Sequence, residues 1–345
     1  MSDWNSFLLS KGAHLNTHGK IEFASQSAAN NATYLIPLEQ GLLEIKGPES
    51  AKFLQGQVTC DVRELADKTT RLGAQCNIKG RMLLCFRALQ ADSERIILRV
   101  HAGLVANGLA SLGKYIVFSK AKLADITQDY RCLGIAGAQA AQLIKNVFGV
   151  EIAQNDDWQA ASEHLIIRIA EDRYECWIAA GQNNNQAEAI WDQLSAQATP
   201  ANQNLWNLLN IQAGIGDITP ETYEAFTPQA INFQLVNGIN FRKGCYTGQE
   251  IVARLHYRGT LKRHMYRFEF SVTDQELPHP GSELKNSDGK TVGEVILAAY
   301  SGSNLGELLA SVVDDKRVDI YLTNNPQKLS LLALPYAIPT PNEAD

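Results

Sequence analysis

Residues 240–255, with the sequence NFRKGCYTGQEIVARL, contain the side chains best suited to chemistry. Thr247 and Glu250 have the T-x-x-E spacing of a capping box ahead of an apolar pair, which predicts a helix that Thr247 caps. Cys245 would then lie two residues before the cap, beside the backbone N–H groups and the positive end of the helix dipole. With the cation of Lys243 nearby, we expect a lowered pKa for this thiol and a reactive thiolate.

A purely structural role for Cys245 is the alternative. A cysteine between a strand and a helix is often only packed, and a capping box by itself is a common start of a helix. Gly244 and Gly248 flank the thiol, and glycine permits a tight bend or the close approach of a ligand. The two glycines therefore favour the functional interpretation.

The other five cysteines have different surroundings. No CxxC pair and no Cys/His spacing suited to zinc is present, so no metal site is expected. The apolar, strand-like runs around residues 85, 132 and 176 predict small buried thiols in a reducing compartment. The five positions are 60, 76, 85, 132 and 176.

The chain has 345 residues and a net charge of −6. This length exceeds what one hydrophobic core serves, so two or three domains are expected. No apolar run reaches membrane-spanning length and residues 1–20 lack the pattern of a secretory signal, which predicts a cytoplasmic protein without a membrane partner. The acidic balance argues against a surface that tracks nucleic acid, although the basic stretch 254–267 leaves direct contact with tRNA as a less favoured alternative.

Strand and helix patterns alternate up to residue 261 and give way to short strands from residue 262. This change predicts two α+β units followed by a separate antiparallel barrel or sandwich. The expected helices cover residues 47–56, 103–114, 138–148, 186–197 and 202–214. The expected strands before residue 262 cover residues 58–62, both sides of a tight turn at 77–80, and 96–101, 115–118, 131–137, 164–170 and 174–180.

The string KGCYTGQE resembles the signature of the YgfZ family, which is itself similar to the T-protein of the glycine cleavage system, an aminomethyltransferase that uses tetrahydrofolate. The resemblance implies an α+β fold of three lobes. Two intertwined α+β lobes in residues 1–261 would form a folate channel, residues 262–338 would form a C-terminal antiparallel β-barrel, and residues 339–345 would be a tail. The similarity spans most of the chain, because it extends to GPESAKFLQGQVTCDV, CNIKGRM, WNLLNIQAG, TPQAINFQ and VARLHYRG.

The resemblance also implies functional residues beside the channel. The signature cysteine falls on Cys245 and the signature lysine on Lys243, which are the residues expected to carry the chemistry. The Gly-Gln-Glu of the signature falls on Gly248, Gln249 and Glu250, which are expected to contact the cofactor.

Further folate contacts are expected from two helices. Trp206 and Asn210 share a helix face and, with Gln212, offer a ring and amides to a pterin. Arg254 and Arg258, four residues apart, offer cations to the glutamate tail. A plain helix flank for Trp206 and a solvated surface for the two arginines are the alternatives.

The function implied is that of a folate-binding accessory factor for assembly or repair of iron–sulfur enzymes, including those that thiolate tRNA. Its cofactor would be tetrahydrofolate or a derivative. The alternative is a tetrahydrofolate-dependent one-carbon transferase of the aminomethyl type. The turn at 77–80 argues against it, because Asn77 and its neighbours lack the aspartate that aminomethyltransferases carry there. Asn210 and Gln212 likewise replace an arginine and a glutamate.

Overall fold

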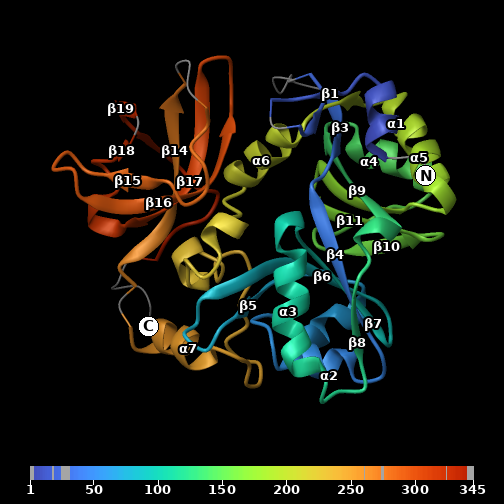
Figure 1. Ribbon diagram of the computed structural model, residues 1–345, viewed down its shortest axis with the longest axis horizontal. Coiled ribbons are helices and arrows are strands. Elements are labelled where there is room, and N and C mark those ends of the chain that lie inside the picture. The colour runs from blue at the N-terminus through green and yellow to red at the C-terminus, as the bar shows by residue number, and fades with distance from the viewer. Residues whose placement is uncertain are drawn as a thin grey trace.

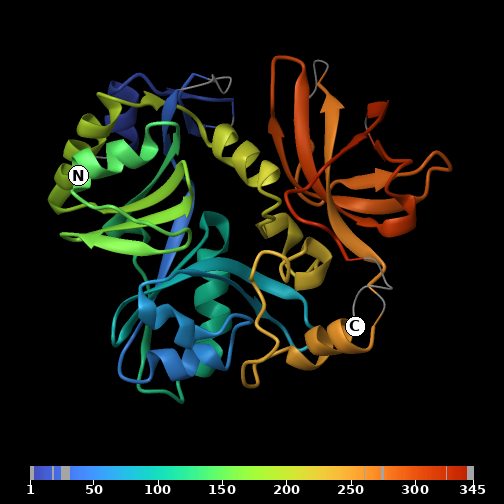
Figure 2. The same ribbon diagram turned by 180° about the vertical axis from the view of Figure 1, so that it is seen from behind.

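The computed structural model describes residues 4–17, 19–24, 32–259, 261–272, 276–323 and 325–339. The ribbon divides into three lobes, each built on its own β-sheet (Figure 1 and Figure 2). Helices cover the sheets of the first two lobes, and the third is mostly β. The predicted α+β class with three lobes is confirmed. Of the predicted tail, residues 340–345 lie outside the described part of the chain.

The first lobe is a five-stranded antiparallel sheet in the order β5-β6-β7-β4-β8. Its strands are β4 (Gln40–Lys46), β5 (Arg71–Cys76), β6 (Met82–Asp92), β7 (Arg95–His101) and β8 (Lys122–Asp125). The helical segments of this lobe are α2 (Ser50–Gln55), the 3-10 helix η1 (Val62–Asp67) and α3 (Val105–Ile116). The turn predicted between two strands at residues 77–80 lies between β5 and β6.

The second lobe is a six-stranded sheet in the order β10-β11-β12-β9-β3-β13. Its strands are β3 (Thr33–Pro37), β9 (Tyr130–Gly137), β10 (Trp158–Ala161), β11 (His164–Ala170), β12 (Arg173–Ala179) and β13 (Thr199–Pro200). Its helices are α1 (Trp4–Ser10), α4 (Ala140–Phe148) and α5 (Asn185–Ser195).

The first two lobes are intertwined along the chain. Strand β3 pairs with β9 in the second sheet, yet β4, which follows after Leu38 and Glu39, joins β7 in the first sheet. Helix α6 (Gln203–Gln212) then leads from β13 toward the third lobe, where Asn204 hydrogen-bonds the backbone of Tyr300. The prediction that the first two lobes are intertwined is therefore confirmed.

The third lobe is a seven-stranded antiparallel sheet that curls into a nearly closed barrel. The barrel is the red and deep orange part at the upper left of Figure 1, and its interior is apolar around Phe268, Val295 and Leu308. Its strands are β14 (Arg263–Ser271), β15 (Glu283–Lys285), β16 (Thr291–Tyr300), β17 (Leu305–Val313), β18 (Tyr321–Leu322), β19 (Asn325–Lys328) and β20 (Ser330–Leu332). A separate two-stranded ribbon joins β1 (His14–Leu15) to β2 (Ile21–Glu22).

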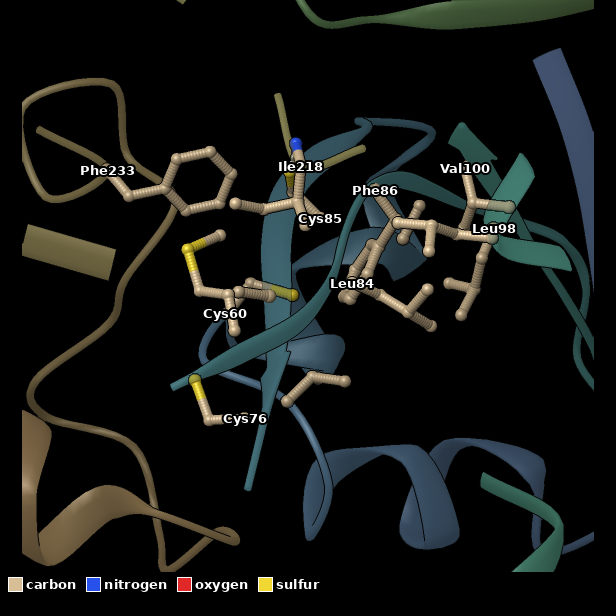
Figure 3. Close-up of a cluster of buried hydrophobic side chains, with 14 of the residues drawn as sticks. Cys60, Cys76, Leu84, Cys85, Phe86, Leu98, Val100, Ile218 and Phe233 are labelled. Atoms are coloured by element: carbon tan, nitrogen blue, oxygen red, sulfur yellow. Dashed lines mark hydrogen bonds between the residues drawn. The ribbon is translucent and has the colours of Figure 1, made fainter. Parts of the chain in front are cut away.

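The core of the first lobe contains three of the cysteines. Figure 3 shows Cys60, Cys76 and Cys85 among Phe86, Phe233 and other apolar side chains. Burial raises the pKa of the Cys60 and Cys76 thiols to about 12, which keeps both protonated at neutral pH. Cys132 and Cys176 are also buried. The prediction of small buried thiols is confirmed.

Two expected strands are absent from the described fold. Val58 forms an isolated bridge with Gln75, and the chain then turns into η1 because the Asp61 carboxylate accepts the N–H of Arg63. At residues 115–118, α3 continues to Ile116, which is buried one helical turn after Leu112. The β-branched composition of both stretches favoured strands, but local capping and helical spacing decided the outcome.

No helix in the described part of the chain is long and apolar enough to cross a membrane.

Candidate functional site

Cys245 lies on an exposed loop just before α7 (Gln249–Tyr257). All six cysteines are among the described residues, and Cys245 is exposed whereas the other five are buried. Gly248 places the start of α7 against the turn after β5. Its φ is +84°, and a Cβ there would clash with the backbone oxygen of Asn77. Glycine at 248 is therefore required by backbone conformation and by close packing.

The expected capping box at Thr247 is wrong. Gly248 is the residue that precedes α7, in the left-handed conformation, and no side chain of a described residue caps the helix. The Thr247 hydroxyl instead faces Oε1 of Gln57 at 3.5 Å, and Glu250 is exposed in the first helical turn. The cap failed because a left-handed Gly248 turns the chain between Thr247 and the helix. Cys245 is consequently four residues before α7 rather than two before a capping threonine.

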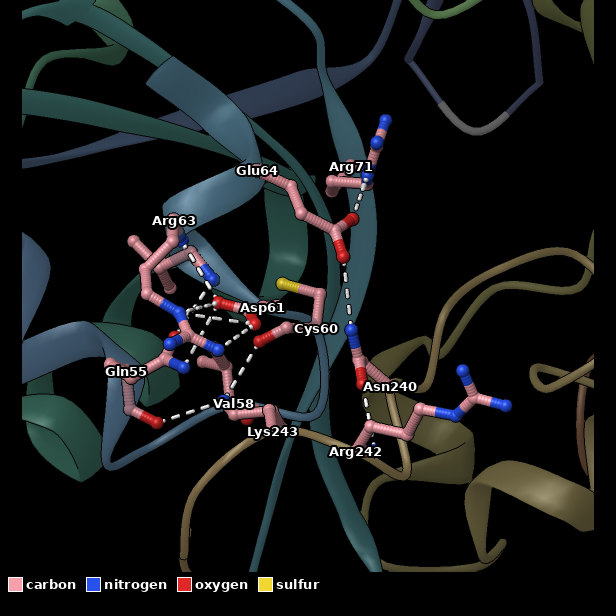
Figure 4. Close-up of polar contacts among 11 residues, drawn as sticks. Gln55, Val58, Cys60, Asp61, Arg63, Glu64, Arg71, Asn240, Arg242 and Lys243 are labelled. Carbon is pink, nitrogen blue, oxygen red and sulfur yellow. Dashed lines mark hydrogen bonds and ion pairs between the residues drawn. The ribbon is translucent and has the colours of Figure 1, made fainter. Parts of the chain in front are cut away.

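Lys243, which was expected to act with Cys245, forms hydrogen bonds with the backbone of the first lobe. Its ammonium group is buried and donates to the backbone oxygens of Gln55 at 2.8 Å, Val58 at 2.5 Å and Cys60 at 2.8 Å (Figure 4). An ammonium has three protons, so all of them are used by the backbone. Burial lowers the pKa of Lys243 to about 8. The residue is a clamp that fixes the chain beneath the Cys245 loop.

Two carboxylates stabilise the segment that Lys243 holds. Asp61 accepts hydrogen bonds from Arg63 and Gln55, and the Arg63 guanidinium lowers the pKa of Asp61 to about 2. Glu64 accepts from Arg71 at 2.6 Å and from Asn240 at 3.0 Å. Figure 4 shows both networks on either side of Cys60. The loop before α7 is therefore attached to the first lobe by polar contacts at several points.

Two of the three residues expected on α6, Trp206 and Asn210, contact a buried charge cluster. Trp206 is 1% exposed, the guanidinium of Arg173 lies 3.9 Å from its ring centroid, and Gly134 packs against the same indole. Arg173 also donates to Asn210. The ring face expected to be free for a ligand is therefore covered, and Trp206 supports Arg173. Gln212 is exposed and its amide is 3.4 Å from Glu307 in the barrel.

Glu175 completes this cluster, which sequence reasoning missed. Arg99 pairs with the Glu175 carboxylate at 3.0 Å. Burial alone would raise the pKa of Glu175, but the nearby Arg99 and Arg87 outweigh it and lower the pKa. Burial lowers the pKa of Arg173 to about 9, and its Nε is among the buried polar atoms without a hydrogen-bond partner in the described structure.

The predicted cofactor residues fall into two groups. Trp206, Asn210 and Gln212 belong to α6, whereas Gly248, Gln249, Glu250 and Arg254 belong to the start and middle of α7. Figure 1 and Figure 2 show these two helices at separate places in the molecule. Arg254 and Arg258 are exposed, and their contact with a glutamate tail stays a prediction.

Comparison with known proteins agrees with this architecture. The GCVT N-terminal domain family matches residues 38–236. The tRNA-modifying protein YgfZ of Klebsiella pneumoniae is 34% identical over 327 residues, which cover 91% of this chain and 96% of that protein. The protein of the same name from Photobacterium profundum is 31% identical over 326 residues, covering 92% and 96%. The chain belongs to the YgfZ family. The resemblance seen in KGCYTGQE is thereby confirmed.

A solved structure supports the fold of this YgfZ-family chain. The glycine cleavage system aminomethyltransferase T from Bartonella henselae superposes with a TM-score of 0.75 over 96% of both chains, at 18% identity. At that identity the likeness establishes the arrangement of the three lobes. It does not extend to the chemistry of individual residues.

A carboxylate that the sequence did not indicate lies beside the turn at residues 77–80 in this family member. The Asn77 amide donates to Oε1 of Glu224 at 3.1 Å, and its own oxygen accepts the N–H groups of Lys79 and Arg81. Glu224 has a φ of +59°, which is uncommon for a residue with a side chain. This positive φ is visible only in the structure, so no sequence pattern indicated that Glu224 lies at the turn.

Proposed function

We propose that this chain is a cytoplasmic, folate-binding accessory factor for the assembly or repair of iron–sulfur enzymes, including those that modify tRNA, and that Cys245 is its reactive group. The exposure of this one thiol, on a loop that Lys243 fixes in place, carries the proposal. The relatives named tRNA-modifying proteins support the link to tRNA. Cys245 would act by redox or transient covalent chemistry on an iron–sulfur enzyme, such as a tRNA thiolation enzyme.

We propose the buried cluster beside α6 as the place where a reduced folate binds, on the basis of its polar groups. A pterin ring offers both hydrogen-bond donors and acceptors, and it needs partners of both kinds when it is buried. Glu175 supplies a buried, ionised acceptor, and Arg173 supplies an Nε–H donor without a partner in the described structure. These two residues would hold the ring, with Asn210 keeping Arg173 in place. Bound tetrahydrofolate would supply a one-carbon unit or a reduced ring.

The test of the cysteine role replaces Cys245 by alanine. Because the side chain is exposed, folding and folate affinity should stay within twofold of the wild type, while tRNA thiolation in cells that depend on this protein should fall. Cys132→Ala is the matched control, since it removes a buried thiol and leaves Cys245 intact. Full thiolation with Cys245→Ala, at normal protein levels, would reject the proposed role of the cysteine.

The second candidate, a tetrahydrofolate-dependent one-carbon transferase, has one observation in its favour. The Glu224 carboxylate lies at the turn where the expected aspartate is missing, hydrogen-bonded to Asn77. The purified protein should then consume a methylene or aminomethyl donor in the presence of tetrahydrofolate, and Glu224→Gln should stop it. If the wild-type protein binds folate but does not consume either donor, the transferase function is rejected and the accessory function remains.

A further inference from the structure

A pocket of about 680 Å³ lies between the first lobe and the segment that leads to Cys245. Its volume is within the range of about 300–1,000 Å³ that is usual for small-ligand sites. The walls come from Glu64 in η1, from residues 70–72 at the start of β5, from Asp156, from residues 236–242 and from the last turn of α7. Neither Cys245 nor Trp206 lines this pocket, so it is separate from the thiol and from the buried charge cluster.

Three aromatic rings form one wall of the pocket. Phe241 and His256 stack with their centroids 3.7 Å apart and their planes 9° from parallel. Tyr257 lies edge-on to His256 at 4.7 Å and is 65% exposed, so its ring is open to a ligand. Partial burial lowers the pKa of His256, which leaves its ring neutral at pH 7. Such a wall offers an aromatic surface to another flat ring.

Positive charge also lines the pocket. Of the two lining carboxylates, Glu64 is bound by Arg71 and Asn240, and Asp156 is paired with Arg87. The guanidinium of Arg242 is exposed and forms no hydrogen bond or ion pair with the described residues. The pocket therefore combines an aromatic wall with a cation that is free to bind an anion.

The cations continue beyond the pocket along α7. Arg254 and Arg258 are exposed and four residues apart, and Arg258 directly follows Tyr257. A ligand with one negative charge would be satisfied by Arg242. A chain of regularly spaced negative charges would use the two further arginines as well, which favours a strand over a single nucleotide.

We propose that this pocket binds one unpaired nucleotide of an RNA strand, with its base against Tyr257 and His256, its phosphate at Arg242, and the neighbouring phosphates at Arg254 and Arg258. Stacking on aromatic side chains combined with contacts to the backbone is the usual way in which proteins hold single strands. The net charge of −6 is compatible with so local a footprint, because only a few phosphates are contacted. The proposal is independent of folate binding and of Cys245.

The test uses the full-length protein and a fluorescent ten-nucleotide single-stranded RNA, with binding followed by anisotropy. Tyr257→Ala should weaken binding about tenfold, which corresponds to about 1.4 kcal/mol. Tyr257→Phe should keep near wild-type affinity because the ring remains. Tyr115→Ala, which removes an exposed ring on α3 away from the pocket, should have no effect. Far-UV circular dichroism would establish that each variant is folded.

The salt dependence identifies the phosphate contacts. Three phosphate contacts on a single strand predict a slope of about −2 for the logarithm of affinity against the logarithm of salt, and Arg242→Ala should reduce this slope by about 0.7. The proposal is overturned if single-stranded RNA does not bind, or if Tyr115→Ala weakens binding as much as Tyr257→Ala. It is also overturned if AMP binds as tightly as the strand, or if a duplex of the same sequence binds equally well.

Discussion

Replacing Lys243 by methionine should destabilise the first lobe, because the ammonium group binds three backbone oxygens that would lose their donor. Each hydrogen bond from a charged donor contributes about 2 kcal/mol, or about 6 kcal/mol for three. Burying the charge opposes this, and it lowers the pKa of Lys243 to about 8. The net loss on substitution should therefore be smaller than the sum of the three hydrogen bonds, at about 3 kcal/mol.

The assay combines denaturant unfolding with hydrogen exchange. The backbone N–H of Thr247 bonds the oxygen of Gly56, and that of Asn240 bonds the oxygen of Thr59, so both amides report on the clamp. A local loss of about 3 kcal/mol should speed their exchange roughly a hundredfold. Lys52→Met is the matched control, since Lys52 is 82% exposed and forms a surface ion pair with Glu49.

The control should lose less than about 0.5 kcal/mol. The clamp is refuted if Lys243→Met is as stable as Lys52→Met and exchange at Thr247 and Asn240 is unchanged. If Lys243→Met is as stable as the wild type but its Cys245 thiol reacts more slowly, Lys243 has the catalytic role that the family resemblance implies.

Three further predictions concern positions described above. The pKa of Asp61 is about 2 in the folded protein and about 3.8 when unfolded, so its ionised form stabilises the fold above pH 4, and this contribution is lost as the pH falls toward 2. Asp61→Asn should thus cost about 1–2 kcal/mol in urea unfolding at pH 6 and progressively less below pH 4; an equal loss at both pH values would contradict this. Gly248→Ala should lower stability by about 2 kcal/mol or more because of the positive φ and the clash with Asn77, whereas Gly244→Ala, which meets nothing within 4 Å, should change the thermal midpoint little. Arg173→Gln should weaken the binding of a reduced folate at least tenfold in a titration. Unchanged affinity would mean that the pterin ring binds outside the buried cluster beside α6.

The sequence was sufficient for features that depend on neighbours along the chain. Helix α6, the turn at residues 77–80 and the burial of Cys85, Cys132 and Cys176 followed from spacing and composition. The family and its three-lobed fold followed from KGCYTGQE and the matching segments, because contiguous identity is specific where periodicity is not.

What the sequence could not provide was the long-range partner of each polar group. The oxygens that bind Lys243 belong to residues some 185 positions earlier, and Arg173 of β12 contacts Trp206 and Asn210 of α6. The failed cap at Thr247 has a similar cause. Gly248 adopts its left-handed conformation because the chain must approach Asn77 closely, and that contact is tertiary.

The passage of the chain from β3 into β4 has a consequence for biosynthesis. Strand β3 leaves the ribosome early, but its antiparallel partner β9 begins at Tyr130 and its parallel partner β13 at Thr199. The first sheet can close once β8 has emerged, while β3 must wait with both edges open. Nascent chains in this interval carry an apolar strand that invites aggregation or chaperone binding, so translation speed between these segments bears on the yield of native protein.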